Sequence, residues 1–153
     1  MPLVYADTSA LFAYFHPLDA FALPVTRAAK KLAPDFAYWP LLRFELRHNL
    51  RQSRKDHYGE IAWRALRAAE KTQARLRWQP ELKLDSLLDA AEEFSADKAQ
   101  SSHAGSMDFL HIAAARRISR DMDLDAFWTC DAEQAKTASL TGLRVTLFQI
   151  PKA

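Results

Sequence analysis

The sequence has few of the residues that form disulfides and nucleotide-binding loops. Its 153 residues include one cysteine and three glycines. A single cysteine, Cys130, cannot form an internal disulfide or a cysteine-rich metal site, and this usage is typical of a reducing compartment. The glycines, Gly59, Gly105 and Gly142, lie too far apart for a Walker loop or a G-x-G-x-x-G loop. The sequence therefore disfavours enzymes that use a nucleotide cofactor.

Long apolar runs and a strong excess of one charge are also missing. No stretch approaches the ~20 apolar residues of a membrane span. The first residues carry no leading positive charge, and Asp7 interrupts their apolar run, so we expect no signal peptide and a cytoplasmic location. With 49% hydrophobic residues, 26% charged residues and a net charge of +2, the composition predicts one globular domain over residues 1–153.

Short apolar runs alternate with helical patterns along the chain. The runs predict strands at 3–6, 36–39, 126–129 and 143–148. Periodicity and capping residues predict helices at 8–15, 19–33, 40–54, 57–77, 84–97, 107–120 and 131–138. Strands joined by helices indicate an α/β fold with a mostly parallel sheet. In such a sheet, ligands bind outside the carboxyl ends of the strands, which is where Asp7 and Asp131 lie.

Four acidic residues are candidates for chemistry: Asp7, Glu45, Asp108 and Asp131. Each also has a purely structural explanation. Asp7 and Asp131 are suited to cap helices, and Asp108 stands where a helix dipole favours an acid. Glu45 faces a partly apolar side of its helix, where it needs either a partner such as arginine or exposure to solvent.

Taken together, the four carboxylates predict a metal site. Mg²⁺ and Mn²⁺ are held by carboxylate and water oxygens rather than by cysteine or histidine cages. Carboxylates crowded together without a cation would repel one another and raise one another's pKa values. If the four acids converge, we therefore expect them to bind a divalent cation.

The segments around these acids are Val-Tyr-Ala-Asp7-Thr8-Ser9, Phe-Glu45-Leu-Arg-His-Asn49, Met-Asp108-Phe-Leu-His and Thr129-Cys-Asp131. In order and spacing, over nearly the whole chain, they resemble the successive motifs of PIN-domain ribonucleases, especially the VapC toxins. The resemblance implies a three-layer α/β/α sandwich. It implies that Asp7, Glu45, Asp108 and Asp131 are the metal ligands and catalytic residues, supported by Thr8 or Ser9. It also implies Mg²⁺- or Mn²⁺-dependent RNA cleavage, a homodimer, and inhibition by an antitoxin whose tail enters the acidic groove.

The mechanism expected from such a site is hydrolysis by a metal-activated water, which leaves a 3′-hydroxyl and a 5′-phosphate. No serine, cysteine or histidine is needed as the nucleophile. His111 follows Asp108 by one helical turn, and we interpret it as a histidine packed at a helix face rather than as a ligand. The other histidines lack the paired spacing of a zinc site.

Charge is distributed unevenly. Residues 43–77 hold ten Lys and Arg against four Asp and Glu, whereas residues 81–97 hold one lysine against six acids. The basic block, residues 43–77, can contact RNA phosphates, although a solvated helical face is the alternative. Trp39, Trp63 and Trp78 are expected in the core rather than stacked on bases. An apolar surface for the antitoxin is expected from Leu11, Phe12, Phe15 and Phe21.

Two other functions are compatible with parts of this pattern. One is a Mg²⁺-dependent phosphatase with Asp7 as its nucleophile, but the haloacid-dehalogenase type has a second Asp two positions later, where this chain has Ser9. The other is a catalytically silent α/β scaffold that binds RNA or acts in signalling. The mutual positions of the four carboxylates distinguish these alternatives best.

Overall fold

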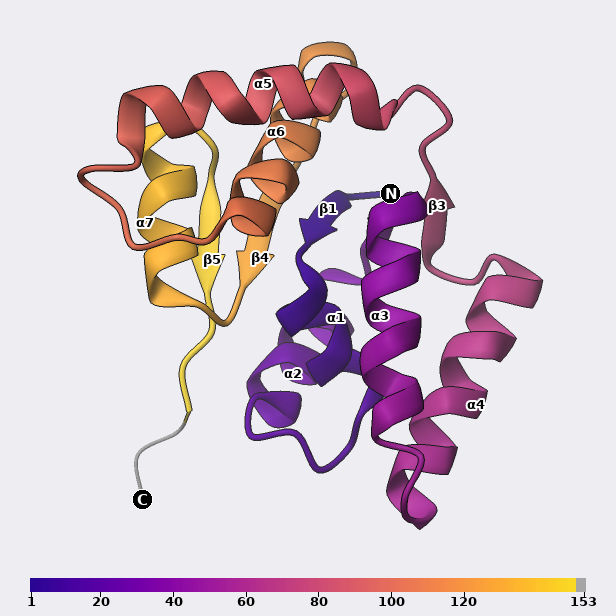
Figure 1. Cartoon of the computed structure of the whole chain (residues 1–153). Helices are drawn as coiled ribbons and strands as arrows, with labels where there is room; N and C mark the ends of the chain where they lie inside the picture. Colours follow the sequence, from indigo (N-terminus) through magenta and orange to yellow (C-terminus); the bar gives the residue numbers. More distant parts are fainter. Residues whose placement is uncertain (151–153) are drawn as a thin grey trace.

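The computed structural model describes residues 1–150, and its centre is a five-stranded parallel sheet (Figure 1). The strands are β1 (Leu3–Ala6), β2 (Asp35–Tyr38), β3 (Leu76–Trp78), β4 (Ala126–Thr129) and β5 (Val145–Leu147). They lie in the order β3-β2-β1-β4-β5, so β1 is central and pairs with both β2 and β4. All four residues of β1 are buried, which is expected of a parallel strand covered on both faces.

The helices of the described residues pack around this sheet and give a three-layer α/β/α fold, as predicted. They are α1 (Thr8–Phe15), α2 (Ala22–Leu32), α3 (Pro40–Gln52), α4 (His57–Thr72), α5 (Leu84–Lys98), α6 (Ser106–Asp121) and α7 (Ala132–Leu140). Helix α1 packs against α2 and α3, whereas α5 lies across α6 on the other side of the molecule (Figure 1). No helix within residues 1–150 is long and apolar enough to cross a membrane.

The strand order reverses direction next to β1. From β1 the chain builds outward to β2 and β3, then returns to the opposite side of β1 to form β4 and β5. At such a reversal the connections leave β1 and β4 in opposite directions, which opens a crevice outside the carboxyl ends of these two strands. Asp7 directly follows β1, and Asp131 lies two residues after β4. The topology therefore places two of the four acids at the same crevice.

Two element boundaries differ from the sequence prediction by more than two residues. The helix predicted at 57–77 ends at Thr72, because Gln73 and Arg75 adopt left-handed backbone angles, with φ of 54° and 65°. The residues beyond form β3, whose Leu76 is buried against the sheet. The helix predicted at 19–33 begins at Ala22, because Asp19 instead accepts a hydrogen bond from the backbone N–H of Phe21 and stabilises a turn.

Candidate functional site

All four predicted acids line one cavity of about 130 Å³, which we call the acidic cavity. Its lining residues are Asp7, Thr8, Ser9, Glu45, Met107, Asp108, His111, Asp131 and Gln134. They come from the starts of α1, α6 and α7 and from the middle of α3. The structure thus brings together carboxylates that lie far apart in the sequence.

Asp7 is the most buried of the four acids, with 4% of its surface exposed. Its Oδ1 accepts hydrogen bonds from Ser9 Oγ at 2.6 Å and from the Ala10 backbone N–H at 2.9 Å, so it caps α1. Its Oδ2 accepts a hydrogen bond from Thr129 Oγ1 at 2.7 Å. Burial raises the pKa of Asp7 despite these hydrogen bonds. A carboxylate in this position gains from a nearby cation.

Glu45 is held by two side chains from other helices. Its Oε1 accepts a hydrogen bond from Thr8 Oγ1 at 3.0 Å and lies 2.7 Å from His111 Nε2. Partial burial acts to raise the pKa of Glu45, but the hydrogen bonds from His111 and Thr8 outweigh it, and the pKa lies below its ordinary value. The ionised form of Glu45 is therefore favoured. His111 and Thr8 stabilise it, rather than an arginine or full exposure to solvent.

A buried chain of hydrogen bonds fixes the orientation of His111. Trp39 Nε1 can only donate, and it donates to the Tyr5 hydroxyl at 2.9 Å. The single hydroxyl hydrogen of Tyr5 is then free to point at His111 Nδ1, which lies 2.7 Å away and accepts it in the tautomer that gives every group of this chain a partner. The ring hydrogen of His111 consequently sits on Nε2 and points at Glu45.

Asp108 and Asp131 line the acidic cavity from helix starts. Asp108 Oδ2 accepts a hydrogen bond from the Gly105 backbone N–H at 2.8 Å. The pKa of Asp108 is raised, mainly by burial and further by Asp131 and Glu45. Asp131 is exposed, and its Oδ1 accepts hydrogen bonds from the backbone N–H groups of Glu133 and Gln134 at 2.8 and 3.1 Å. Asp131 caps α7 and Asp108 lies in the first turn of α6, both as predicted, and each uses only one carboxylate oxygen for these hydrogen bonds.

Two polar residues of the acidic cavity were missed from the sequence. His111 is buried and packed, as predicted, but it also contacts Glu45 and so belongs to the site; its position one turn after Asp108 was the available signal. Gln134 is 1% exposed, and its Nε2 is the one buried side-chain polar atom among residues 1–150 that has no hydrogen-bond partner. Gln134 follows Asp131 by one turn of α7. A buried amide donor without a partner is available to a ligand.

The chemistry of these donors fits a hard divalent cation. Within residues 1–150, no three His, Cys, Asp or Glu side chains are grouped closely enough to hold a metal ion by themselves. Mg²⁺ usually keeps several waters and binds through one or two carboxylates together with substrate phosphates. A small cavity lined by four carboxylates suits such a hydrated ion better than a tight all-protein cage.

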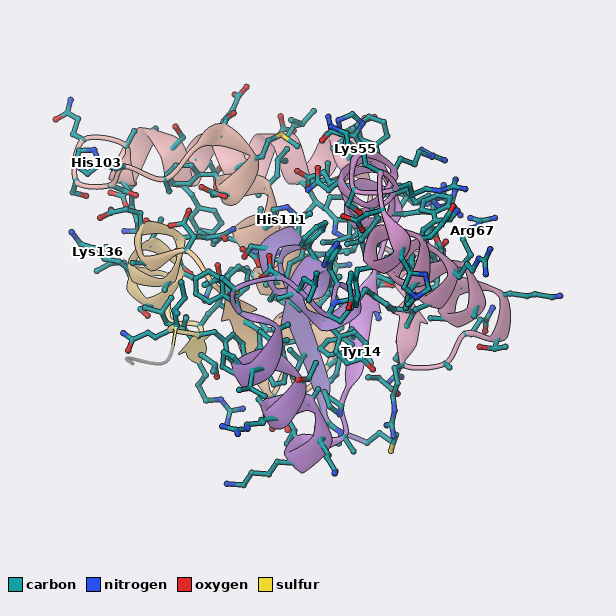
Figure 2. All side chains as sticks on the ribbon, turned by 90° about the horizontal axis from the view of Figure 1, so that it is seen from below. Tyr14, Lys55, Arg67, His103, His111 and Lys136 are labelled. Carbon is teal, nitrogen blue, oxygen red and sulfur yellow. The ribbon has the colours of Figure 1, made fainter. Side chains whose placement is uncertain are left out.

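The basic block lies on α3 and α4 and the β3 strand that follows them. In Figure 2, Lys55 and Arg67 lie on this side of the molecule, while His111 lies near the middle of the view. The guanidinium carbons of Arg51, Arg54 and Arg67 lie 5.1, 5.1 and 5.8 Å from the centre of the Trp63 ring. Arg54 and Arg67 are also ion-paired with Glu60 and Glu70, so of these three arginines Arg51 alone has no acidic partner within residues 1–150 and can contact a phosphate.

The predicted positions of the tryptophans and of the apolar surface are partly wrong. Trp39 is buried in the core as predicted, whereas Trp63 is only half-buried and Trp78 is 43% exposed. Leu11 and Phe15 are buried in the core and cannot form a binding surface. The reason is that α1 is covered by the sheet, α2 and α3, so only one side of this short helix remains open. Phe12 and Phe21 do remain accessible and line a second cavity.

In comparisons with known proteins, no protein-family model matches the chain, and no curated protein is significantly similar to it.

Proposed function

We propose that this protein is a metal-dependent endoribonuclease that hydrolyses RNA phosphodiester bonds, and that it is the toxin of a toxin–antitoxin pair. The observation that supports the proposal most is that Asp7, Glu45, Asp108 and Asp131 line one cavity at the carboxyl ends of β1 and β4. The motifs around these acids resemble those of PIN-domain ribonucleases, and the fold class agrees with that resemblance.

Most residues of the acidic cavity have a defined part in this proposal. Asp7, Asp108 and Asp131 would hold one Mg²⁺ or Mn²⁺ ion, and Glu45 would bind the same ion or anchor a second one. When bound, the ion lowers the pKa of a water and offsets the charge on the scissile phosphate. His111 and Thr8 keep Glu45 oriented and ionised.

Gln134 would donate a hydrogen bond from Nε2 to the substrate. This buried amide has no partner among residues 1–150, and it lines a cavity whose other walls are mainly carboxylates. A phosphate oxygen that enters with the metal is an acceptor suited to it. Gln134 therefore adds one neutral donor to a site where negative charge must otherwise be balanced by the cation.

The alternatives have less support. A phosphatase of the haloacid-dehalogenase type that uses Asp7 as its nucleophile has a second Asp two positions later, where this chain has Ser9, and Ser9 Oγ donates a hydrogen bond to Asp7 instead. A silent scaffold has no need for four carboxylates around one cavity, which repel one another when no cation is present. The basic block favours a polyanionic substrate such as RNA over a small phosphate ester.

The partners follow from the same proposal. An unrestrained cytoplasmic ribonuclease harms its own cell, so we expect a protein antitoxin with Arg or Lys side chains that pair with the acidic cavity. We also propose that the chain acts as a homodimer. Expression of the wild-type chain alone should arrest growth of the native host, and co-expression of the antitoxin should restore it. Equal growth with the wild-type and Asp7→Asn chains would contradict the toxin assignment.

The direct test of the enzymatic proposal is cleavage of single-stranded RNA by the purified protein. We expect cleavage with Mg²⁺ or Mn²⁺, none with EDTA, and a loss of about a hundredfold or more in Asp108→Asn. Asp89→Asn removes an exposed acid of α5 that does not line the cavity, so it is the matched control. Products with 2′,3′-cyclic phosphate ends would contradict hydrolysis by a metal-activated water, because they arise from attack by the neighbouring 2′-hydroxyl.

A further inference from the structure

A second cavity, larger than the first, opens beside the acidic cavity. It has a volume of about 640 Å³, and Thr8, Ser9 and Asp131 line both cavities. We call it the side pocket. Its other walls include Phe12, Asp19, Phe21, Asn49, Gln52 and Cys130. A molecule bound across Thr8 and Ser9 can therefore occupy both cavities at once.

Two helices lead from one cavity into the other. Asn49 and Gln52 follow Glu45 on α3 by four and seven residues, so they lie on the same helix face one and two turns farther along. On α1, Phe12 follows Thr8 by one turn. Helices α1 and α3 therefore each contribute residues to both cavities and connect them.

The chemistry of the side pocket matches a nucleobase. Phe12 and Phe21 supply aromatic faces on which a flat ring can stack, and the amides of Asn49 and Gln52 offer donors and acceptors to its edge. Neither amide forms a side-chain hydrogen bond with another residue of 1–150, so both are available.

Other ligands fit the side pocket less well. No Lys or Arg lines it, while Asp19 and Asp131 do, so a phosphate or an acidic peptide would be repelled. A purely apolar side chain would leave the two amides and the Asp19 carboxylate without partners.

Local contacts hold the Phe12 ring and the turn before Phe21 in place in the wall of the side pocket. The Phe12 ring stacks on the His16 ring, with centroids 5.2 Å apart and planes 15° apart. The backbone N–H of Phe21 donates to Asp19 Oδ2 at 2.9 Å, which fixes the turn that carries the second phenyl ring. These contacts hold the Phe12 ring and the turn before Phe21 in place before a ligand binds.

We propose that the side pocket binds one unstacked base of the RNA strand whose phosphodiester enters the acidic cavity, and that it sets the base preference next to the cut. This inference rests on the proposed ribonuclease function. The phosphate goes to the metal and the adjoining base goes to the pocket, so the chain would prefer particular nucleotides at one side of the cut. Recognition by stacking and edge hydrogen bonds requires an unpaired base, which makes single-stranded RNA the substrate.

The binding step is tested with uncharged nucleosides, without metal and without cleavage. Asn49 is the only asparagine of the sequence, so its side-chain NH₂ signals in an NMR spectrum can be assigned by one substitution. We expect at least one of adenosine, cytidine, guanosine and uridine to shift the NH₂ signals of Asn49 and Gln52, while ribose 5-phosphate does not. Asn49→Ala and Gln52→Ala should each weaken binding of that nucleoside about fivefold or more. Gln100→Ala, which removes an exposed amide outside the pocket, should leave it unchanged.

The proposal is overturned if no nucleoside at millimolar concentration moves the Asn49 signals, if ribose 5-phosphate moves them equally, or if both alanine variants bind like the wild type. The Phe12→Leu variant tests whether the base stacks on the Phe12 ring. It should weaken nucleoside binding and leave the backbone NMR spectrum, and hence the fold, unchanged. Normal binding by this variant would overturn the role of the ring.

Cleavage of an RNA pool with a randomised position then separates this proposal from the proposed function. We expect the wild type to favour one or two bases beside the cut, and Gln52→Ala to reduce that preference about fivefold. Nucleoside binding without any metal-dependent cleavage would contradict the ribonuclease function while retaining the pocket. Cleavage with an unchanged base preference in both Asn49→Ala and Gln52→Ala would contradict the pocket while retaining the ribonuclease.

Discussion

Tyr5 Oη lies 2.7 Å from His111 Nδ1, and this buried contact decides which nitrogen of His111 faces Glu45. Tyr5 belongs to the central strand β1, whereas His111 lies on α6. The hydroxyl receives its own hydrogen bond from Trp39, so the chain of donors runs from the core to the acidic cavity. The core of the sheet thereby positions a carboxylate of the candidate site.

We predict that Tyr5→Phe destabilises the protein by about 1–3 kcal/mol, although the ring shape is kept. The substitution leaves Trp39 Nε1 and His111 Nδ1 buried without a partner. Urea unfolding measures the change, and ¹⁵N NMR of His111 shows whether the hydrogen stays on Nε2. Tyr14→Phe is the control, because the Tyr14 hydroxyl forms no hydrogen bond within residues 1–150. Equal stability of Tyr5→Phe and wild type would contradict the hydrogen-bond chain.

A second prediction concerns pH and metal-free stability. Burial raises the pKa of Asp7 in the folded protein, so the native state holds this proton more tightly than the unfolded chain does. The contribution of Asp7 to the stability of the metal-free wild type should therefore fall as pH rises from about 4, the pKa of an unfolded Asp, through the raised pKa of Asp7. The Asp7→Asn variant has no carboxyl group to titrate at this position. Its free energy of unfolding, relative to that of wild type, should therefore increase with pH.

Asn at position 7 can be accommodated, because Thr129 also lies 3.0 Å from Gln134 Oε1 and can donate there while it accepts from the new amide. Chemical denaturation in EDTA at several pH values measures the effect, with Asp89→Asn as the control. A stability difference between Asp7→Asn and wild type that does not vary with pH would contradict the raised pKa.

Much of the fold is visible in the sequence because its signals are local. The short apolar runs before Asp7 and Asp131 predict β1 and β4, and both acids then cap the helices that follow. Strand β3 was missed because the helix before it is ended by Gln73 and Arg75 in left-handed conformations, which neither residue type indicates. Local patterns thus predict elements well but not the places where non-glycine residues adopt unusual backbone angles.

The site was predictable only in part for a different reason. The four acids stand next to recognisable helix starts or on a helix face, but the α/β topology places only Asp7 and Asp131 at the same crevice. The role of His111 depends on Tyr5, which is 106 residues away in the sequence, and on Glu45, which is 66 residues away. Such long-range hydrogen bonds leave no periodic pattern in one sequence.

A third prediction concerns the thiol in the wall of the side pocket. Burial, with a contribution from the negative charge of Asp7, raises the pKa of Cys130 to about 12. We expect Cys130 to react slowly with a disulfide reagent at neutral pH, with a rate that keeps rising up to strongly alkaline pH. The urea-unfolded chain, with an ordinary thiol pKa of about 8.5, should react much faster. A plateau in the native rate near pH ~9 would contradict the raised pKa.

A fourth prediction tests the close approach that joins α3 to α4. A Cβ atom at Gly59 would lie 1.6 Å from the backbone oxygen of Ser53, so the two segments could not keep their positions. Gly59→Ala should therefore destabilise the protein by about 3 kcal/mol or more, measured by urea unfolding. At Gly105 the nearest heavy atom to such a Cβ is 3.7 Å away, so Gly105→Ala is the matched control and should cost much less. Similar losses in both variants would contradict the packing of α3 on α4.

The claim on which the account depends is that the four carboxylates of the acidic cavity form one divalent-cation site. The most direct measurement is a titration of the purified wild-type chain with Mn²⁺, in which electron paramagnetic resonance counts the free ion. We expect saturable binding that Asp108→Asn and Asp131→Asn each weaken about tenfold or more, while Asp89→Asn leaves it unchanged. Equal Mn²⁺ binding by all four proteins, or no binding to the wild type at millimolar Mn²⁺, would contradict the account.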